Sequence, residues 1–318
     1  MKPDLESKPL FVERMKLLLG DEYENYVEFL SKPELKSIRV NTLKTSPSEL
    51  KKMLEEKGWE IKQPFKNYPE IMIVEPELLP GELGRSLEHI LGYYYAQEIA
   101  SMLPVIVLNP QPGEKVLDIA AAPGSKTTQI AMMMKNSGLI IANDVKLPRI
   151  KILASNLERC GVTNEIITRS SGQRLCEQLK KQGFLFDKIL LDAPCSGEGT
   201  LRSTPRSIQM WNIQRVYRMS KEQKRLLISA LEVLKIGGEI VYSTCTHAPE
   251  ENEEVIDSIL NEFKNIKVEK IILPIKCKSG LTSWKGKNYN KELKNSCRIY
   301  PHISDTEGFF IAKLRKTK

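Results

Sequence analysis

Two cysteines lie shortly after apolar runs of the sequence, in positions where a thiol could act as a nucleophile. Cys195 follows the run 188–191, Cys245 follows the run 239–242, and Asp192 precedes Cys195 by three residues. A thiolate attacks electron-poor carbon, and a nearby carboxyl group can hold or move a proton. Either cysteine alone is more often a small buried apolar residue. Two of them at matching strand ends favour catalysis.

A loop of small residues after another apolar run predicts a cofactor site. Residues 116–119 are followed by Ala120-Ala121-Ala122-Pro123-Gly124-Ser125-Lys126, and a helix is expected to begin there. Small side chains let a ligand approach the backbone, and a helix start offers free N–H groups. The loop lacks the three spaced glycines of a nicotinamide fingerprint and the first glycine of a P-loop. The alternative is a tight strand-to-helix turn without a ligand.

A carboxylate after the next apolar run is a candidate ribose ligand. Asp144 follows Leu139-Ile140-Ile141-Ala142-Asn143, 20 positions beyond Gly124. In nucleoside-binding doubly wound folds an acidic residue at this strand end accepts hydrogen bonds from ribose hydroxyls. Taken alone, an aspartate after a strand is more often a turn or helix cap, by about two to one.

The elements that must position these residues form an alternating pattern. Apolar strands are expected at 115–119, 139–142, 165–167, 188–191 and 239–242, with helices between them, and a closing antiparallel edge strand at 308–314. Near-continuous apolar strands joined by helices indicate an α/β fold with a doubly wound, Rossmann-like parallel sheet. Ligands bind such sheets at the carboxyl ends of the strands, so Cys195 and Cys245 should face one crevice.

The first part of the chain predicts a smaller unit. Residues 1 to about 36 have helical spacing, 38–41 and 71–74 predict strands, Ser46 and Pro47 open a helix that Gly58 closes, and a further helix should end near Pro104. We therefore expect an N-terminal domain at 1–95, with a helical cap and a small α+β unit. A catalytic domain should occupy 96–318.

Charge and composition narrow the class of protein. The net charge is +8, and residues 101–318 carry 34 basic against 22 acidic side chains, a difference of +12. The positive electrostatic potential of such a segment attracts nucleic acid, although a solvated lysine-rich surface has the same composition. The six cysteines have no C-x-x-C spacing, so neither zinc nor another metal site is expected. A charged start and no apolar run near ~20 residues predict a cytoplasmic protein without a membrane span.

Three long motifs, in this order, carry a specific resemblance: Asp-x-Ala-Ala-Ala-Pro-Gly-Ser-Lys-Thr, Asp-Ala-Pro-Cys-Ser-Gly and Tyr-Ser-Thr-Cys-Thr-x-x-Pro-Glu-Glu-Asn-Glu. The chain resembles the NOL1/NOP2/Sun (RsmB-like) family of RNA 5-methylcytosine methyltransferases, from about residue 37 to 314. The upstream segments Arg39-Val40-Asn41-Thr42-Leu43-Lys44 and 92–98 are also similar. The resemblance implies an S-adenosylmethionine methyltransferase sheet and an RNA-recognition-like N-terminal domain that helps place RNA.

The resemblance also implies roles for individual residues. Cys245 would add to C6 of cytosine, Cys195 would help release the methylated product, and Asp192 would contact the N3/N4 edge, with Lys126 beside it. Cofactor contacts would come from the loop and strand ends: Ala120, Ala121, Ala122, Pro123, Gly124, Ser125, Lys126, Asp144, Arg149 and Asp192. Where the family commonly has an acidic residue for adenine, this chain has Arg169-Ser170-Ser171. Ser170 is therefore the candidate adenine contact.

The segment between the two cysteines interleaves basic and aromatic residues that could pair with phosphates and stack on a base: Arg202, Arg206, Trp211, Arg215, Tyr217, Arg218, Lys221, Lys224 and Arg225. A solvated helix with a buried Trp211 explains it equally well. On family likeness and size we favour tRNA as substrate and a monomeric enzyme. The alternatives are an rRNA cytosine-C5 methyltransferase, a non-catalytic RNA-binding or assembly factor, and a small-molecule methyltransferase.

Overall fold

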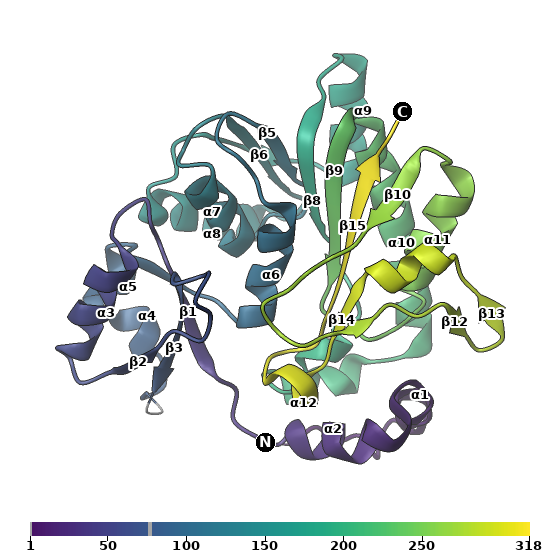
Figure 1. The fold of residues 1–318 in the computed structure, drawn as a ribbon, viewed down its shortest axis with the longest axis horizontal. Helices are drawn as coiled ribbons and strands as arrows, with labels where there is room; N and C mark the ends of the chain where they lie inside the picture. The colour runs from purple at the N-terminus through teal and green to yellow at the C-terminus, as the bar shows by residue number, and fades with distance from the viewer. Residues whose placement is uncertain (1, 76–77) are drawn as a thin grey trace. The chain divides into compact units, whose positions relative to one another are not determined.

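The computed structural model describes residues 2–75 and 78–318, which divide into two compact units (Figure 1). The first unit comprises Met1–Glu34, Leu191–Glu232 and Ile236–Lys318, and the second comprises Leu35–Leu190 and Val233–Lys235. Residues 1, 76 and 77 of the predicted N-terminal domain lie outside the described residues. Among the described helices, none is both long and apolar enough to cross a bilayer.

The second unit begins with a small antiparallel sheet. Its elements, in chain order, are β1 (Lys36–Val40), α3 (Pro47–Glu55), β2 (Glu60–Lys62), β3 (Ile71–Glu75), α4 (Glu82–Arg85), α5 (Leu87–Ile90) and β4 (Tyr94–Ala96). The strand order β2-β3-β1-β4 and the βαββααβ sequence confirm the α+β expectation. Ser46 caps α3 and Pro47 lies in its first turn, as predicted, and Glu49 completes a capping box with Ser46.

The parallel sheet follows in the same unit. Its strands are β5 (Lys115–Asp118), β6 (Leu139–Asp144), β7 (Glu165–Arg169) and β8 (Phe186–Asp192), in the order β8-β5-β6-β7. The last two residues of β8, Leu191 and Asp192, belong to the first unit. The helices α6 (Ile99–Leu108), α7 (Ser125–Met133), α8 (Leu147–Cys160) and α9 (Gly172–Lys181) alternate with them. The predicted strands and parallel pairing are confirmed. The helix end near Pro104 is wrong, because Pro104 lies buried within α6 among apolar residues whose packing outweighs the lost N–H bond.

The first unit contains the remaining strands: β9 (Leu234–Thr244), β10 (Ile266–Glu269), β11 (Lys278–Ser279), β12 (Ser283–Trp284), β13 (Lys287–Asn288), β14 (Cys297–Ile299) and β15 (Phe309–Lys316). β15 runs antiparallel beside β9, as Figure 1 shows, and also pairs with β14 and β10. The antiparallel direction predicted for this last strand is confirmed. Its place at the edge is wrong, because both sides of β15 are paired.

Helices of the first unit come from distant parts of the chain. They are α1 (Pro9–Leu19), α2 (Tyr23–Phe29), α10 (Ile213–Glu232), α11 (Glu253–Glu262) and α12 (Pro301–Ser304), with 3-10 turns at Gly20–Glu22, Glu198–Thr200, Pro205–Met210 and Lys291–Asn295. The apolar faces of α1 and α2 pack on Leu201, Trp211 and Tyr300, and Phe11 meets the Trp211 ring edge-on at 5.3 Å. The predicted helical cap therefore shares a core with residues 201–300.

Candidate active site and cofactor loop

The side chains of Cys195 and Cys245 meet in the first unit, just beyond the ends of β8 and β9. Their Sγ atoms are 3.2 Å apart, and both cysteines are half-buried free thiols. The hydrogen bond with Cys245 and burial raise the pKa of Cys195 well above its usual value. Cys195 therefore keeps its proton and can donate it toward the sulfur of Cys245.

The residues after the two cysteines hold the two loops together. Ser196 Oγ and Thr246 Oγ1 are 2.8 Å apart, and both residues are buried. Farther along, the Gly199 N–H donates to the Cys245 carbonyl at 2.9 Å. These bonds fix the backbone beside each thiol, so the short distance between the sulfurs is built into the fold.

Asp192 is oriented by a serine of the neighbouring strand. Ser243, which is fully buried, donates its hydroxyl to Asp192 Oδ1 at 2.7 Å, and the Ala193 N–H donates to the Ser243 carbonyl at 2.8 Å. Asp192, Cys195 and Cys245 thus lie on adjoining strand ends of one unit. Ser243 was missed in the sequence although it stands in the Ser-Thr-Cys motif. The signal was a hydroxyl within an apolar strand, because a buried hydroxyl needs a hydrogen-bond partner.

The small-residue loop of the second unit is held mainly by its own backbone and by Asn143. The Ala121 N–H donates to the Asn143 carbonyl at 2.7 Å, and Asn143 Nδ2 donates to the Ile119 carbonyl at 3.0 Å. Gly124 has φ +105°, a left-handed conformation in which a Cβ would meet Leu153 at 3.0 Å. The glycine is therefore required by the turn itself.

The start of α7 offers an anion or dipole site. Gly124 precedes the helix and has no side chain with which to cap it, and N–H groups at a helix start can bind a ligand. Lys126 Nζ donates to Ser101 Oγ at 3.0 Å, and Thr127 Oγ1 donates to the buried Asp118 at 2.7 Å. Lys126 and Asp192 belong to different units, so the expected placement of Lys126 beside Asp192 stays a prediction.

Arg39, from the upstream motif, clamps the first turn of α7. It is buried, donates to Thr128 Oγ1 at 2.7 Å and to the Ser125 carbonyl at 2.8 Å, and also bonds Gln97. Asn41 in the same motif donates to the carbonyls of Gly92 and Cys160 at 2.8 and 2.7 Å. Arg39 therefore joins the antiparallel sheet to the start of α7, and Asn41 joins it to the end of α8. The sequence did not reveal either role.

Asp144 lies buried at the end of β6 with two protein donors. Its Oδ1 accepts from the Lys146 N–H at 3.0 Å, and its Oδ2 pairs with Arg149 Nη1 at 3.2 Å. Arg149 also donates to the Ala122 carbonyl, so it ties the carboxylate to the loop. Since each carboxylate oxygen can accept a second bond, Asp144 can still receive ribose hydroxyls.

Asn143 holds the backbone of Ser170, the predicted adenine contact at the end of β7. Asn143 Oδ1 accepts from the Ser170 N–H at 3.1 Å, and its Nδ2 donates to the Ser170 carbonyl at 3.1 Å. Ser171 uses its side chain to cap α9. Of the two serines, Ser170 is therefore the one whose hydroxyl is not used as the helix cap.

The basic and aromatic segment between the cysteines separates into two groups. Trp211 is buried and donates to Glu198 at 2.7 Å, while Arg202 is buried and pairs with Asp305 at 2.8 Å. Both residues therefore stabilise the fold. The burial of Trp211 is what the alternative, a solvated helix with a buried Trp211, predicts. Lys224 pairs with Glu262 at 3.5 Å. Of the basic and aromatic residues in this segment, the exposed ones are Arg206, Tyr217, Arg218, Lys221 and Arg225.

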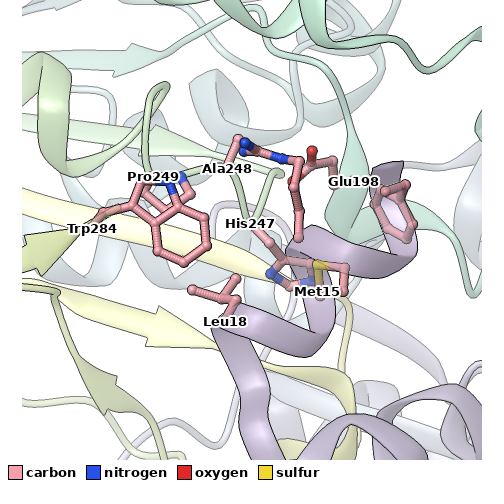
Figure 2. A pocket seen from close by; sticks show the side chains of 9 residues that line it. Met15, Leu18, Glu198, His247, Ala248, Pro249 and Trp284 are labelled. Carbon is pink, nitrogen blue, oxygen red and sulfur yellow. The ribbon is translucent and has the colours of Figure 1, made fainter. Parts of the chain in front are cut away.

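A small pocket lies beneath α1 in the first unit. Figure 2 shows Met15 and Leu18 of α1 facing His247 and Trp284 across it. Burial lowers the pKa of His247 to about 3, and its ring stacks on Tyr300 at 5.0 Å. The pocket is therefore a gap in the packing beside a neutral histidine. Neither Cys195 nor Cys245 lines it.

Comparison with known proteins agrees with this geometry. Residues 105–315 match the family model of 16S rRNA methyltransferase RsmB/F, and residues 8–99 match the N-terminal domain of 16S rRNA methyltransferase RsmF. A tRNA (cytosine(49)-C(5))-methyltransferase of Pyrococcus abyssi is 43% identical over 96% of both chains. A ribosomal RNA small subunit methyltransferase F of Vibrio parahaemolyticus is 38% identical over 99% of this chain and 64% of its own.

Solved structures of methyltransferases are also similar to this chain over most of its length. A methyltransferase homolog protein from Pyrococcus horikoshii has a TM-score of 0.85 at 39% identity, covering 96% of this chain and 94% of its own. NSun6 from Pyrococcus horikoshii, solved with SFG, has a TM-score of 0.81 at 27% identity, covering 96% and 97%. These neighbours confirm the Rossmann-like methyltransferase sheet. The chain belongs to the Sun (RsmB/F) family of S-adenosylmethionine-dependent RNA methyltransferases.

Proposed function

We propose that the protein methylates C5 of cytosine in RNA through a covalent adduct between Cys245 and C6 of the base. The contact of 3.2 Å between the sulfurs of Cys245 and Cys195 is the observation that carries this proposal. C5 of cytosine is a poor nucleophile, so a thiolate must first add to C6 and make C5 enamine-like. A non-catalytic binder would have no need of paired thiols beside a carboxylate.

The two thiols have different roles: Cys245 adds to the base, and Cys195 helps to release the methylated product. Cys195 holds its proton, so Cys245 is the sulfur that attacks C6 as a thiolate. In release, the C5–H bond breaks, its electrons form the C5–C6 double bond, and the C6–S bond to Cys245 breaks. Cys195 takes the C5 proton while its own proton passes to the departing sulfur of Cys245. Both thiols then carry protons, and the loss of one to solvent restores the starting pair.

Asp192 is assigned to the N3/N4 edge of cytosine, where a proton makes C6 more electrophilic. The hydrogen bond from Ser243 to Oδ1 fixes the orientation of this carboxyl group. Lys126, with Ser101 beside it, is assigned to support this edge.

The residues of the second unit fit the cofactor. When bound, S-adenosylmethionine supplies the electrophilic methyl group that C5 takes. The loop 120–126 would hold its methionine part at the open helix start, and Asp144, positioned by Arg149, would hold the ribose hydroxyls. Val145 and Leu147, which are 56% and 45% exposed despite being apolar, offer a surface for adenine beside Ser170. These residue roles are proposals.

We infer tRNA as the substrate, because the relative that matches over 96% of both chains is a tRNA methyltransferase. The relative named for ribosomal RNA makes rRNA the second candidate, although this chain spans only 64% of it. A monomeric, cytoplasmic enzyme, with an RNA-placing domain at 1–95 and a catalytic domain at 96–318, completes the proposal. Exposed Arg218, Lys221 and Arg225 on α10 would contact phosphates.

The test is methylation of unmodified tRNA and rRNA by the full chain with labelled S-adenosylmethionine, with the nucleoside identified by mass spectrometry. We expect 5-methylcytidine in tRNA, no product from Cys245→Ala, and a stable protein–RNA adduct from Cys195→Ala on a denaturing gel. Cys277→Ala, a cysteine outside the pair, is the control and should behave as wild type. Product from Cys245→Ala, or methylation at another atom, would contradict the proposal.

A further inference from the structure

The acidic segment before α11 is buried, and its carboxylates have separate partners. From the sequence, Glu250-Glu251-Asn252-Glu253-Glu254 is expected to be an acidic helix start, but α11 begins only at Glu253. Glu250 pairs with Arg14 at 2.6 Å, and Glu253 pairs with Arg298. Glu251 is fully buried, and among the described residues it has no cationic partner.

Glu251 instead bonds the loop that carries Cys195. Its Oε2 accepts from the Ser196 N–H at 3.0 Å and from Gln223 Nε2 at 2.8 Å. Gln223, on α10, also donates from Nε2 to the Pro194 carbonyl at 2.9 Å. The peptide groups on both sides of Cys195 are therefore held by this one pair of side chains.

The position of Glu251 is itself fixed. The Tyr242 hydroxyl, buried in β9, donates to the Glu251 carbonyl. Two elements that are distant in sequence, α10 and the segment before α11, thus converge on the turn 194–196. Since that turn carries a thiol in contact with Cys245, a small displacement of either side chain would change the distance between the sulfurs.

The chemistry of the site favours a role beyond packing. A buried carboxyl group without a cation is costly, and an apolar residue would fill the space at lower cost. Burial raises the pKa of Glu251 to about 8, and the neighbouring Glu198 acts in the same direction. Glu251 in turn helps to raise the pKa of Cys195. The carboxyl group therefore influences both the position and the protonation of that thiol.

We propose that Glu251 and Gln223 are positioning residues for Cys195, which hold the turn 194–196 so that the two thiols stay in contact during release of the methylated RNA. This inference rests on the proposed function only for its last step. The clamp on Cys195 can be measured without any RNA.

The first experiment measures alkylation of Cys195 by iodoacetamide in the full chain carrying Cys245→Ala, followed by peptide mass spectrometry. Adding Glu251→Ala frees the turn and should speed alkylation by about tenfold at pH 7. Glu251→Gln keeps the acceptor oxygen, so it should react as the parent at pH 7. At pH 9, where Glu251 is ionised, Glu251→Gln should react faster, because loss of the negative charge lowers the pKa of Cys195.

The second experiment measures release with RNA. Glu251→Ala and Gln223→Ala should turn over about tenfold more slowly and accumulate the adduct, and Glu251→Gln should restore turnover. Glu254→Gln is the matched control, because Glu254 pairs with Lys287 at 2.7 Å on the surface side of the same segment. Thermal unfolding shows whether each variant folds, and Gln223→Ala replaces Glu251→Ala if the latter does not.

The outcomes separate the two proposals. If Cys195→Ala forms no adduct, the proposed role of Cys195 in release is contradicted. The alkylation rates still test whether Glu251 and Gln223 hold the turn 194–196. Folded Glu251→Ala and Gln223→Ala variants with parental alkylation rates would overturn the clamp. Loss of turnover without adduct, and without rescue by Glu251→Gln, would reduce Glu251 to a structural residue.

Discussion

Removing the Ser243 hydroxyl tests how Asp192 is held. Ser243→Ala deletes one bond of 2.7 Å to Asp192 Oδ1 in a fully buried place, where water does not replace it. A hydrogen bond to a charged group is worth about 1.5–3 kcal/mol. If that bond sets the orientation of Asp192 in the transition state, kcat/KM should fall by about 10- to 100-fold. The backbone bond between Ala193 and Ser243 remains, so the strand ends should keep their pairing.

The assay is initial-rate methylation of tRNA with labelled S-adenosylmethionine, repeated in an Asp192→Ala background. The effect of Ser243→Ala should vanish there, because the two side chains act as one unit. Ser229→Ala is the matched control, since its hydroxyl donates to the Arg225 carbonyl of its own helix at 3.0 Å. A kcat/KM within about twofold of wild type would refute the reasoning, as would an equal loss with and without Asp192.

Three further predictions concern stability. Arg298→Met should lower the free energy of unfolding in urea by about 3–5 kcal/mol, because it leaves the fully buried Glu253 uncompensated; exposed Arg206→Met should change it by less than about 0.5 kcal/mol. Gly92→Ala should lower Tm and yield, because φ is +74° and its Cβ would lie 1.9 Å from the Arg159 carbonyl oxygen; a wild-type melting curve would contradict this. The pKa of His247 is about 3 in the fold against 6.5 unfolded, so this residue contributes stability above pH 6.5 that is lost as the pH falls toward 3; His247→Phe should flatten that loss in urea titrations at pH 7 and pH 4.5, and an unchanged slope would count against it.

The strands of the parallel sheet, and the candidate site residues that follow them, could be predicted because the apolar pattern of each strand lies in a few consecutive residues. Runs such as Leu139–Ala142 are apolar enough to indicate a buried parallel sheet, and the parallel direction puts their carboxyl ends at one edge. The same reasoning predicted Cys195 and Cys245 as neighbours, and their sulfurs lie 3.2 Å apart. These inferences needed no knowledge of what packs on the sheet.

The polar clamps could not be predicted, because each depends on a partner far along the chain. Arg39 bonds residues nearly 90 positions away, and Glu251 bonds Ser196 across 55. In the sequence both look like charged surface residues. Likewise, the periodicity of α1 indicates an apolar face but not that Trp211 and Tyr300 cover it. Long-range burial of polar groups carries no local pattern, so it appears only in three dimensions.

The shared core of α1, α2 and residues 201–300 has a consequence for synthesis on the ribosome. Phe11 leaves the exit tunnel 200 positions ahead of Trp211, the ring against which it packs. At ~5–20 residues per second, the nascent N-terminal helices wait roughly 10–40 s with their apolar faces uncovered. Apolar surface exposed for that long during synthesis is prone to aggregate. The first unit, which carries Cys195 and Cys245, can complete its core only after most of the chain has been synthesised.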